Sequence, residues 1–134
     1  MVCVMLGSND LKAAFRLTAE EIAGQAARVL ARAREVVESK YPHSPCEYLL
    51  ISPIEAGQEL LDGPFGWEFE GLLTIKKSKE FALCFAKEAQ DHDFLFFDAA
   101  KYAAAGKIDG LHMDAANHRK LGEAMGRWLL AHYA

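Results

Sequence analysis

The sequence predicts an α/β fold of three layers, in which a parallel sheet lies between helices on both of its faces. Three short, mostly apolar runs, at residues 2–6, 48–52 and 94–98, are typical of strands buried on both faces of such a sheet. A helical pattern follows each run, so the predicted element order is strand–helix repeated three times. With 134 residues the chain has the length of one domain, and we expect residues 1–134 to form a single α/β domain.

The first expected strand, at residues 2–6, is apolar at every position and ends at Gly7. Such a run indicates a central strand, with Cys3 among the core residues. A central strand needs a neighbour on each edge, because an open apolar edge promotes aggregation. The sequence offers no earlier segment for that place. We therefore expect either that another chain covers the edge, in a homo-oligomer, or that the sequence lacks its own N-terminal part.

The first helix is expected to begin directly after Thr18. Residues 18–21 form a capping-box pattern, in which a threonine and the glutamate three residues later each satisfy a backbone N–H group. Apolar residues then recur at helical spacing and predict a buried face that consists of Ile22, Ala26, Val29, Leu30, Ala33 and Val37. Pro42 and Pro45 end the helical region before the second strand begins.

A long loop rich in glycine and aromatic residues is expected at 54–73, because Pro53 stops the second strand. Loops longer than about 12–15 residues in a compact domain usually have a function. A helix of about four turns should follow from near Ser78, and its apolar spacing predicts that it buries Phe81, Phe85 and Ala89.

The third strand, at 94–98, leads into a second loop that contains Gly106 and the segment 109–112. The last helix is expected to begin at Asp114, a residue type that often caps helix N-termini. Its apolar spacing predicts a buried face made of Leu121, Met125, Trp128 and Leu129.

Composition excludes several classes of function. The chain has 15 Lys and Arg against 19 Asp and Glu, a net charge of −4, which is not the basic footprint of a nucleic-acid-binding protein. Its 3 cysteines form no C-x-x-C pair and no disulfide framework, which is typical of a reducing compartment. No apolar run is long enough to span a bilayer, and no basic segment of a signal peptide precedes the first strand. We therefore expect a cytoplasmic protein without a membrane partner.

Neither a metal nor an organic cofactor is expected. His43 with Cys46, and the segment 91–93, contain ligand types for metals, but neither has a second pair at the spacing of a zinc site. The glycines of the 54–73 loop form no G-x-G-x-x-G pattern after a strand, so nucleotide binding is not indicated.

The first candidate site is the turn at residues 7–10, because ligands of open α/β sheets bind at the carboxyl ends of the strands. Gly7 allows a sharp turn there, and the side-chain amide of Asn9 offers two hydrogen-bond donors to a developing oxyanion. The alternative is a plain turn, in which Asn9 or Asp10 hydrogen-bonds to its own backbone.

The second candidate site is the segment from Asp109 to His112. With two residues between them, the carboxylate can accept the imidazole Nδ1–H, which fixes the tautomer and leaves Nε2 to act as a general base. The alternative is a solvated aspartate and a histidine that caps the next helix.

Together, these two segments resemble the SGNH (GDSL-type) hydrolases. Gly7-Ser8-Asn9-Asp10 resembles the G-x-N-D block of that family, and Asp109-Gly110-Leu111-His112 resembles its D-G-x-H block. The helix that follows, with Asn117-His118 and Leu121-Gly122, is similar as well. Residues 5–12, Phe15, and the segments 51–53 and 69–71 look most like the arylesterase and acyltransferase branch.

The resemblance implies a flavodoxin-like architecture and a serine ester hydrolase or acyltransferase that acts on small carboxylic esters. It implies that Asn9 is an oxyanion donor beside the turn at Gly7, that His112 is the general base, and that Asp109 orients it. The substrate pocket is expected to include Phe15, Ile54, Trp67 and Phe69, although the loop aromatics are also suited to packing against another subunit.

The nucleophilic serine that the family requires is not expected among these residues. The family has it after its first strand, and a glycine donor after its second, both before the G-x-N-D block with which this sequence opens. The chain thus resembles the C-terminal part of such a hydrolase, without the first two strands. Ser52 ends a strand at the expected edge but lies in no G-x-S-x-G turn. Ser8 would have to leave the G-x-N-D turn, Ser78 should start a helix, and the proline-rich link is flanked by Ser39 and Ser44. We therefore expect little or no esterase activity from this chain alone; the alternative is a non-catalytic fragment or subunit that works only by association.

Overall fold

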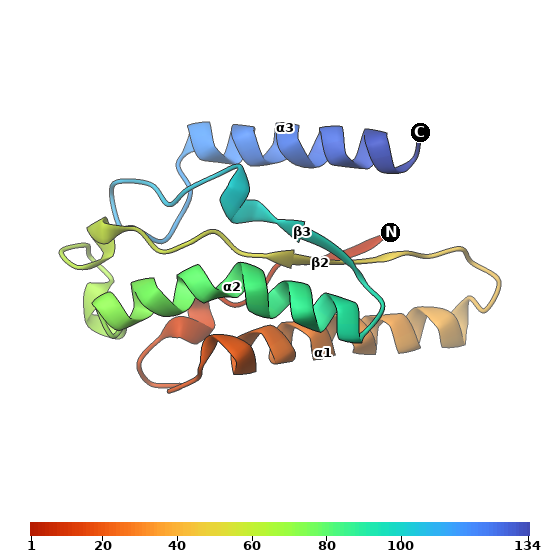
Figure 1. The fold of residues 1–134 in the computed structure, drawn as a ribbon, viewed down its shortest axis with the longest axis horizontal. Helices are drawn as coiled ribbons and strands as arrows, with labels where there is room; N and C mark the ends of the chain where they lie inside the picture. Colours follow the sequence, from red (N-terminus) through yellow and green to blue (C-terminus); the bar gives the residue numbers. More distant parts are fainter.

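A computed structural model describes all 134 residues and contains a parallel sheet of three strands with helices on both faces. The sheet has the order β1-β2-β3, and its strands are β1 (Val2–Val4), β2 (Tyr48–Ser52) and β3 (Leu95–Asp98). In Figure 1, α1 (Ala19–Lys40) and α2 (Leu72–Asp91) lie below the sheet, and α3 (Ala115–His132) lies above it. The predicted α/β class and the element order are confirmed.

The strand register brings the carboxyl ends of all three strands to one edge of the sheet. Leu49 in the middle of the sheet pairs with Cys3 on one side and Leu95 on the other, and Ser52 pairs with Asp98. The segments that leave the strands at this edge are the turn after Gly7, the long loop after Pro53 and the short helix after Asp98.

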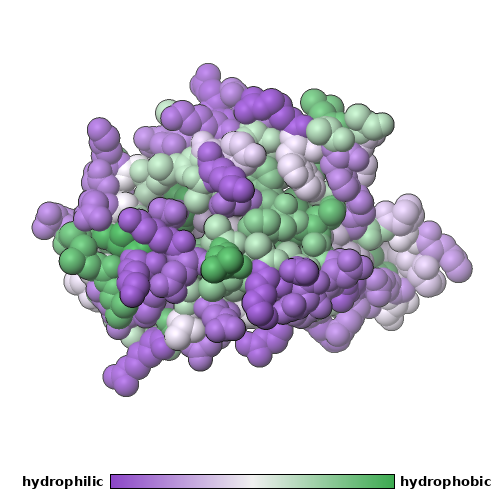
Figure 2. Space-filling model, viewed as in Figure 1, coloured by the Kyte–Doolittle hydropathy of each residue, from purple (hydrophilic) through white to green (hydrophobic).

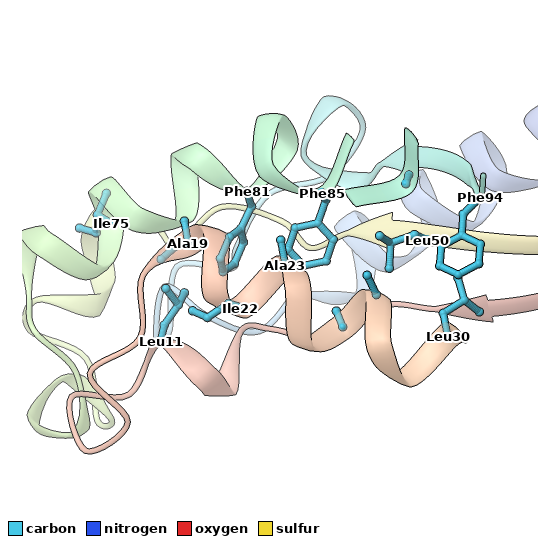
Figure 3. Packing of buried hydrophobic residues seen from close by; sticks show 14 of the residues in the cluster. Leu11, Ala19, Ile22, Ala23, Leu30, Leu50, Ile75, Phe81, Phe85 and Phe94 are labelled. Carbon is cyan, nitrogen blue, oxygen red and sulfur yellow. The ribbon is translucent and has the colours of Figure 1, made fainter. Parts of the chain in front are cut away.

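The larger part of the core lies between the sheet and the two helices α1 and α2. Figure 3 shows Phe81 and Phe85 of α2 reaching towards α1, where Ile22 is buried. The predicted capping box starts α1, since Thr18 Oγ1 accepts the N–H of Glu21 and the Glu21 carboxylate accepts the N–H of Thr18. Val29, predicted to be buried on this helix, is instead 48% exposed because it lies outside the face that packs on the sheet.

A smaller core fills the space between the sheet and α3. It contains Leu49, Ile51 and Phe97 from the strands, with Trp128 partly buried against them. Of the α3 residues, only Ala124 is fully buried. The predicted face of Leu121, Met125, Trp128 and Leu129 is half-buried rather than buried, because α3 covers a narrow sheet.

Polar contacts hold α3 at both of its ends. Near its start, Asn117 Oδ1 accepts the N–H of Ala104 at 3.0 Å. At its end, the Glu47 carboxylate accepts hydrogen bonds from His132 Nε2 at 2.8 Å and from the Tyr133 hydroxyl at 2.6 Å. As predicted, Asp114 caps α3, and its carboxylate accepts the N–H of Asn117.

The first strand differs from the prediction. It is a three-residue strand at the edge of the sheet rather than a five-residue strand buried on both faces. Cys3, Met5 and Leu6 are exposed and not part of the core. The reason is that β1 has a neighbour on one edge only and a helix over one face only, since its packed side chains, Val2 and Val4, belong to the core on the α1 side.

The second helix also differs from the prediction, because it begins at Leu72 and not near Ser78. Ser78 is a buried mid-helix residue whose hydroxyl donates to Ile75 O at 2.8 Å and accepts the N–H of Ala56 at 2.9 Å. Ser78 therefore does not start the helix, and its hydroxyl links the middle of the helix to the long loop. This helix is 20 residues long, and the loop before it ends at Gly71 rather than at residue 73.

The surface is mixed in character. On the face drawn in Figure 2, hydrophobic side chains (green) lie in the region between α3 and α2, and hydrophilic side chains (purple) surround them. None of the helices combines the length and the apolar character needed to cross a membrane.

Candidate active site

Asp109 and His112 form a hydrogen-bonded pair at the carboxyl edge of the sheet. Asp109 Oδ2 lies 2.7 Å from His112 Nδ1, and Asp109 Oδ1 accepts the backbone N–H groups of Leu111 and His112, each at 2.9 Å. A carboxylate can only accept, so Nδ1 donates in this pair, and in the neutral imidazole Nε2 has a free lone pair. The Asp109 side chain is 11% exposed and that of His112 is 75% exposed, so the imidazole is accessible while its partner is not.

The loop that holds this pair is fixed by backbone hydrogen bonds to its surroundings. Gly110 has a φ of 67°, which glycine adopts without strain, and its carbonyl accepts the N–H of Gly57 at 2.8 Å. Gly106 N–H donates to His112 O at 2.7 Å and closes the loop at its base. The orientation of the imidazole therefore depends on the close approach of two backbone segments, around residues 57–60 and 109–112.

The environment of Asp109 favours its ionised form. Burial acts to raise the pKa of this carboxyl group, but the hydrogen bonds from the Leu111 and His112 N–H groups and from the His112 imidazole outweigh burial. Its pKa is consequently held below the ordinary value, and Asp109 is a carboxylate at neutral pH. An ionised acceptor is what the Nδ1–H of a general base requires.

The lowered pKa of Asp109 predicts a pH dependence of stability. Its contribution is fully present above the ordinary aspartate pKa of about 3.9 and is lost as the pH falls through the lower folded-state pKa. We expect the difference in free energy of unfolding between the wild type and Asp109→Asn to narrow as the pH is lowered from about 5 to about 2. Urea unfolding across this range measures it. A difference in free energy of unfolding that stays constant across this pH range would contradict the ionic role of Asp109.

Asn9 lines the same cavity as His112 and lies in the turn after β1. Gly7 has a φ of 135°, and its carbonyl accepts the N–H of Asp10 at 3.0 Å, which turns the chain sharply after β1. A short helix, Asn9–Leu11, follows, and the buried Leu11 anchors it to the core. Asn9 itself is exposed, so its amide is available to a ligand.

Two cavities share a wall that consists of Asn9, Leu111 and His112. The larger has a volume of about 240 Å³ and is lined besides by Met5, Ser8, Pro53, Ile54, Met113 and His118. The smaller, of about 130 Å³, is lined besides by Lys12, Phe65, Glu68 and Phe69. The candidate base and the candidate oxyanion donor thus line both cavities. The larger has walls of mixed polar and apolar residues, and the smaller has Phe65 and Phe69 beside Lys12 and Glu68.

The four residues predicted for a substrate pocket do not lie together in the structure. Ile54 lines the larger cavity and Phe69 the smaller one. Phe15 is 54% exposed and Trp67 is 82% exposed, and neither lines either cavity. The loop bearing Trp67 turns this side chain to solvent.

The sequence did not predict the ion pair of Lys12 and Glu68. Their side chains form a salt bridge at 2.5 Å, and the Ala13 N–H donates to Glu68 O at 2.9 Å beside it. These contacts join the turn after β1 to the loop before α2 and close one side of the smaller cavity. No signal in the sequence indicates it, because the two residues lie far apart along the chain.

No serine of the chain hydrogen-bonds to His112. Ser52 and Ser78 are fully buried, and the Ser52 hydroxyl has no hydrogen-bond partner. Ser8 lines the larger cavity but belongs to the turn and makes no hydrogen bond to the imidazole. The chain also contains no group of three His, Cys, Asp or Glu side chains placed to hold a metal ion.

Comparison with solved structures finds esterases among the similar proteins. The chain is similar to Est24, a carbohydrate acetylesterase from Sinorhizobium meliloti, with a TM-score of 0.82 and 27% identity over 97% of this chain. It is similar to the aryl esterase of M. smegmatis, with a TM-score of 0.80 and 30% identity over 97% of this chain. It spans 60% of the length of each of these proteins. The sequence matches no protein-family model and no curated protein.

Proposed function

From the premise that this chain has the fold of SGNH-type hydrolases without the first strands of that fold, we propose that it supplies the base, the orienting acid and one oxyanion donor of a serine ester hydrolase. Its similarity to esterases over nearly its whole length supports this proposal. The residues are His112, Asp109 and Asn9. The observation that carries the proposal is the 2.7 Å hydrogen bond of the Asp109–His112 pair beside the Asn9 turn. The substrates are small carboxylic esters.

The proposed reaction uses these three residues and a serine. A serine hydroxyl, supplied by a segment outside these 134 residues, attacks the ester carbonyl while His112 Nε2 takes its proton. The Asn9 amide donates to the oxyanion, and the Asp109 carboxylate stabilises the imidazolium. The bond from the carbonyl carbon to the alkoxy oxygen then breaks, and His112 returns the proton to the leaving alcohol. Water repeats the sequence and releases the carboxylic acid; an alcohol in its place completes an acyl transfer.

A hybrid protein tests the chemistry. In it, these 134 residues replace the matched part of the M. smegmatis aryl esterase, so that the chain acts within one polypeptide. We expect saturable hydrolysis of p-nitrophenyl acetate and a stoichiometric fluorophosphonate adduct in the unmatched part. His112→Ala should lower kcat/KM by about 10⁴-fold or more, because the serine loses its general base.

The matched control is His43→Ala, because His43 is exposed and lies in the link between α1 and β2. It should leave kcat/KM within about twofold of the parent hybrid, since surface changes away from a site have small effects. The 134 residues alone should give neither hydrolysis nor an adduct. An adduct on the isolated chain, at Ser8 for example, or a His112→Ala hybrid of full activity would contradict the proposal.

One observation favours a second, non-catalytic function. The open edge of β1 is a surface through which the chain could work by association alone, as a homo-oligomer or an inactive subunit. A hybrid that folds but gives no hydrolysis and no adduct would favour this alternative.

A further inference from the structure

The larger cavity is lined by two histidines and two methionines, which come from separate segments of the chain. Met5 follows β1 at the carboxyl edge of the sheet. His112 and Met113 lie in the loop between β3 and α3, and His118 lies in the first turns of α3. The fold therefore gathers imidazole nitrogens and thioether sulfurs around one space of about 240 Å³.

The imidazole of His112 is held as the imidazole of a metal ligand is usually held. Its Nδ1 donates to Asp109 Oδ2 at 2.7 Å, and two backbone N–H groups fix Asp109 Oδ1. A histidine that binds a metal almost always donates its other ring N–H to a carboxylate, a carbonyl or water, which orients the ring and makes the ligating nitrogen more basic. The Asp109–His112 pair therefore presents an Nε2 that is suited to a metal ion.

The residue types around the cavity select the kind of ion. No carboxylate belongs to its lining, whereas calcium, magnesium and manganese prefer carboxylate, carbonyl and water oxygens. Zinc is bound in proteins by cysteine, histidine and carboxylate groups, and the chain has no group of three such side chains placed to hold a metal ion. Thioethers are soft ligands that favour copper(I), and imidazole also suits copper. The four side chains are thus a ligand set for a soft, monovalent ion.

The two methionines differ in how firmly they are held. Met113 is half-buried and packs against the core under α3, so its thioether has a fixed place in the wall of the cavity. Met5 is 42% exposed although its side chain is apolar, and His118 is exposed as well. An unbranched methionine side chain adapts to irregular spaces, so Met5 can bring its sulfur to an ion without a change in the sheet.

We propose that this cavity binds one copper(I) ion through the imidazoles of His112 and His118 and the thioethers of Met5 and Met113. The site does not depend on the proposed esterase function, because all four ligands belong to this chain. It does have a consequence for that function. An ion on His112 Nε2 occupies the lone pair with which a general base takes a proton, so metal binding and base action exclude each other at this residue.

A titration with silver(I), a soft monovalent ion that is stable in air, tests the site by NMR. Cysteine thiolates also bind soft ions, so the three cysteines are first replaced by Cys3→Ser, Cys46→Ser and Cys84→Ser. One equivalent of silver(I) should shift the methyl resonances of Met5 and Met113 and the imidazole resonances of His112 and His118. The resonances of Met1, Met125 and His43 should stay in place.

The same shifts should appear in the wild-type chain once its thiols are filled, so the result does not depend on how well the thiol-free variant folds. X-ray absorption of the thiol-free chain loaded with copper(I) should show both nitrogen and sulfur ligands. Zinc(II) should bind at least about a hundredfold more weakly than silver(I), because two of the four ligands are thioethers.

Matched variants separate this site from general affinity for soft ions. Met5→Leu and His118→Ala should each weaken silver(I) binding at least about tenfold, since loss of a partner outside the ligand shell already costs about 10–100-fold. Leucine replaces methionine with little change of volume, so the first variant removes the sulfur and not the packing. Met125→Leu and His43→Ala are the controls, because neither residue lines the cavity, and both should bind silver(I) unchanged. Circular dichroism of each variant shows that the chain is folded.

Three results would overturn the metal site. They are no shift at the four ligands with one equivalent of silver(I), binding that tolerates both Met5→Leu and His118→Ala, and zinc(II) binding as tight as that of silver(I). The hybrid protein tests the esterase chemistry independently. An active hybrid made from a chain that binds no silver(I) refutes the metal site only, and an inactive hybrid made from a chain that binds it at these residues refutes the esterase function only.

Discussion

Replacement of Phe85 by alanine is expected to lower the free energy of unfolding by about 3–5 kcal/mol, the usual cost of removing a buried phenylalanine side chain. Phe85 is 0% exposed and stacks edge-to-face on Phe81, with ring centroids 5.5 Å apart. It also lies directly under the turn after β1, because a Cβ atom added to Gly7 would come within 3.3 Å of its ring. The cavity left by Phe85→Ala should therefore loosen the turn that bears Asn9 as well as the core.

Urea unfolding measures the loss of stability, and hydrogen exchange at the Asp10 amide, which donates to Gly7 O, measures the loosening of the turn. Leu83→Ala on the same helix is the control, because this side chain is 78% exposed and its removal should change the free energy of unfolding by no more than about 0.5 kcal/mol. Equal effects of the two substitutions would contradict the packing described for α2.

Replacement of Gly110 by alanine is expected to have the largest effect on the site itself. A left-handed φ costs a residue with a side chain about 1–2 kcal/mol, and the new Cβ atom would collide with the backbone nitrogen of Leu60. The segments at 57–60 and 109–112 would have to separate, which breaks the hydrogen bond from Gly57 N–H to Gly110 O. We expect a loss of about 2–4 kcal/mol in stability and a displaced His112.

The proton on His112 Nδ1 reports this displacement, because its hydrogen bond to Asp109 gives a strongly downfield proton resonance. That resonance should be present in the wild type and lost in Gly110→Ala. Gly122→Ala and Gly126→Ala are matched controls in α3, where an added Cβ meets nothing within 4 Å. Each should leave the resonance in place and raise stability by up to about 1 kcal/mol, since alanine favours a helix. A retained resonance in Gly110→Ala would show that the loop is less tightly held than its contacts indicate.

Local sequence patterns predicted most of the elements because their causes are local. The capping box at Thr18, the bounds of β2 and the cap of α3 at Asp114 each follow from a few neighbouring residues. The spacing of Asp109 and His112 also predicted their hydrogen bond, although the loop that holds the pair depends on contacts with residues 57–60.

Features that depend on distant packing were not predictable. Ser78 appears as a helix start in the sequence, yet its hydroxyl is satisfied by Ile75 in its own helix and by Ala56 of the long loop. Cys3 has the apolar neighbours of a core residue, but its exposure is decided by the absence of a layer over β1. The Lys12–Glu68 pair joins segments more than 50 residues apart, and no local pattern indicates it.

The way in which α3 is attached affects which part of the fold unfolds first. This helix buries one residue fully, so its position depends to an unusual degree on the polar tethers at its two ends, Asn117 with Ala104 and Glu47 with His132 and Tyr133. Sub-global unfolding favours units with little buried apolar area, so we expect α3 to detach before α1 and α2. The chain enters α3 only three residues after His112, so we expect undocking of this helix to displace the imidazole from Asp109.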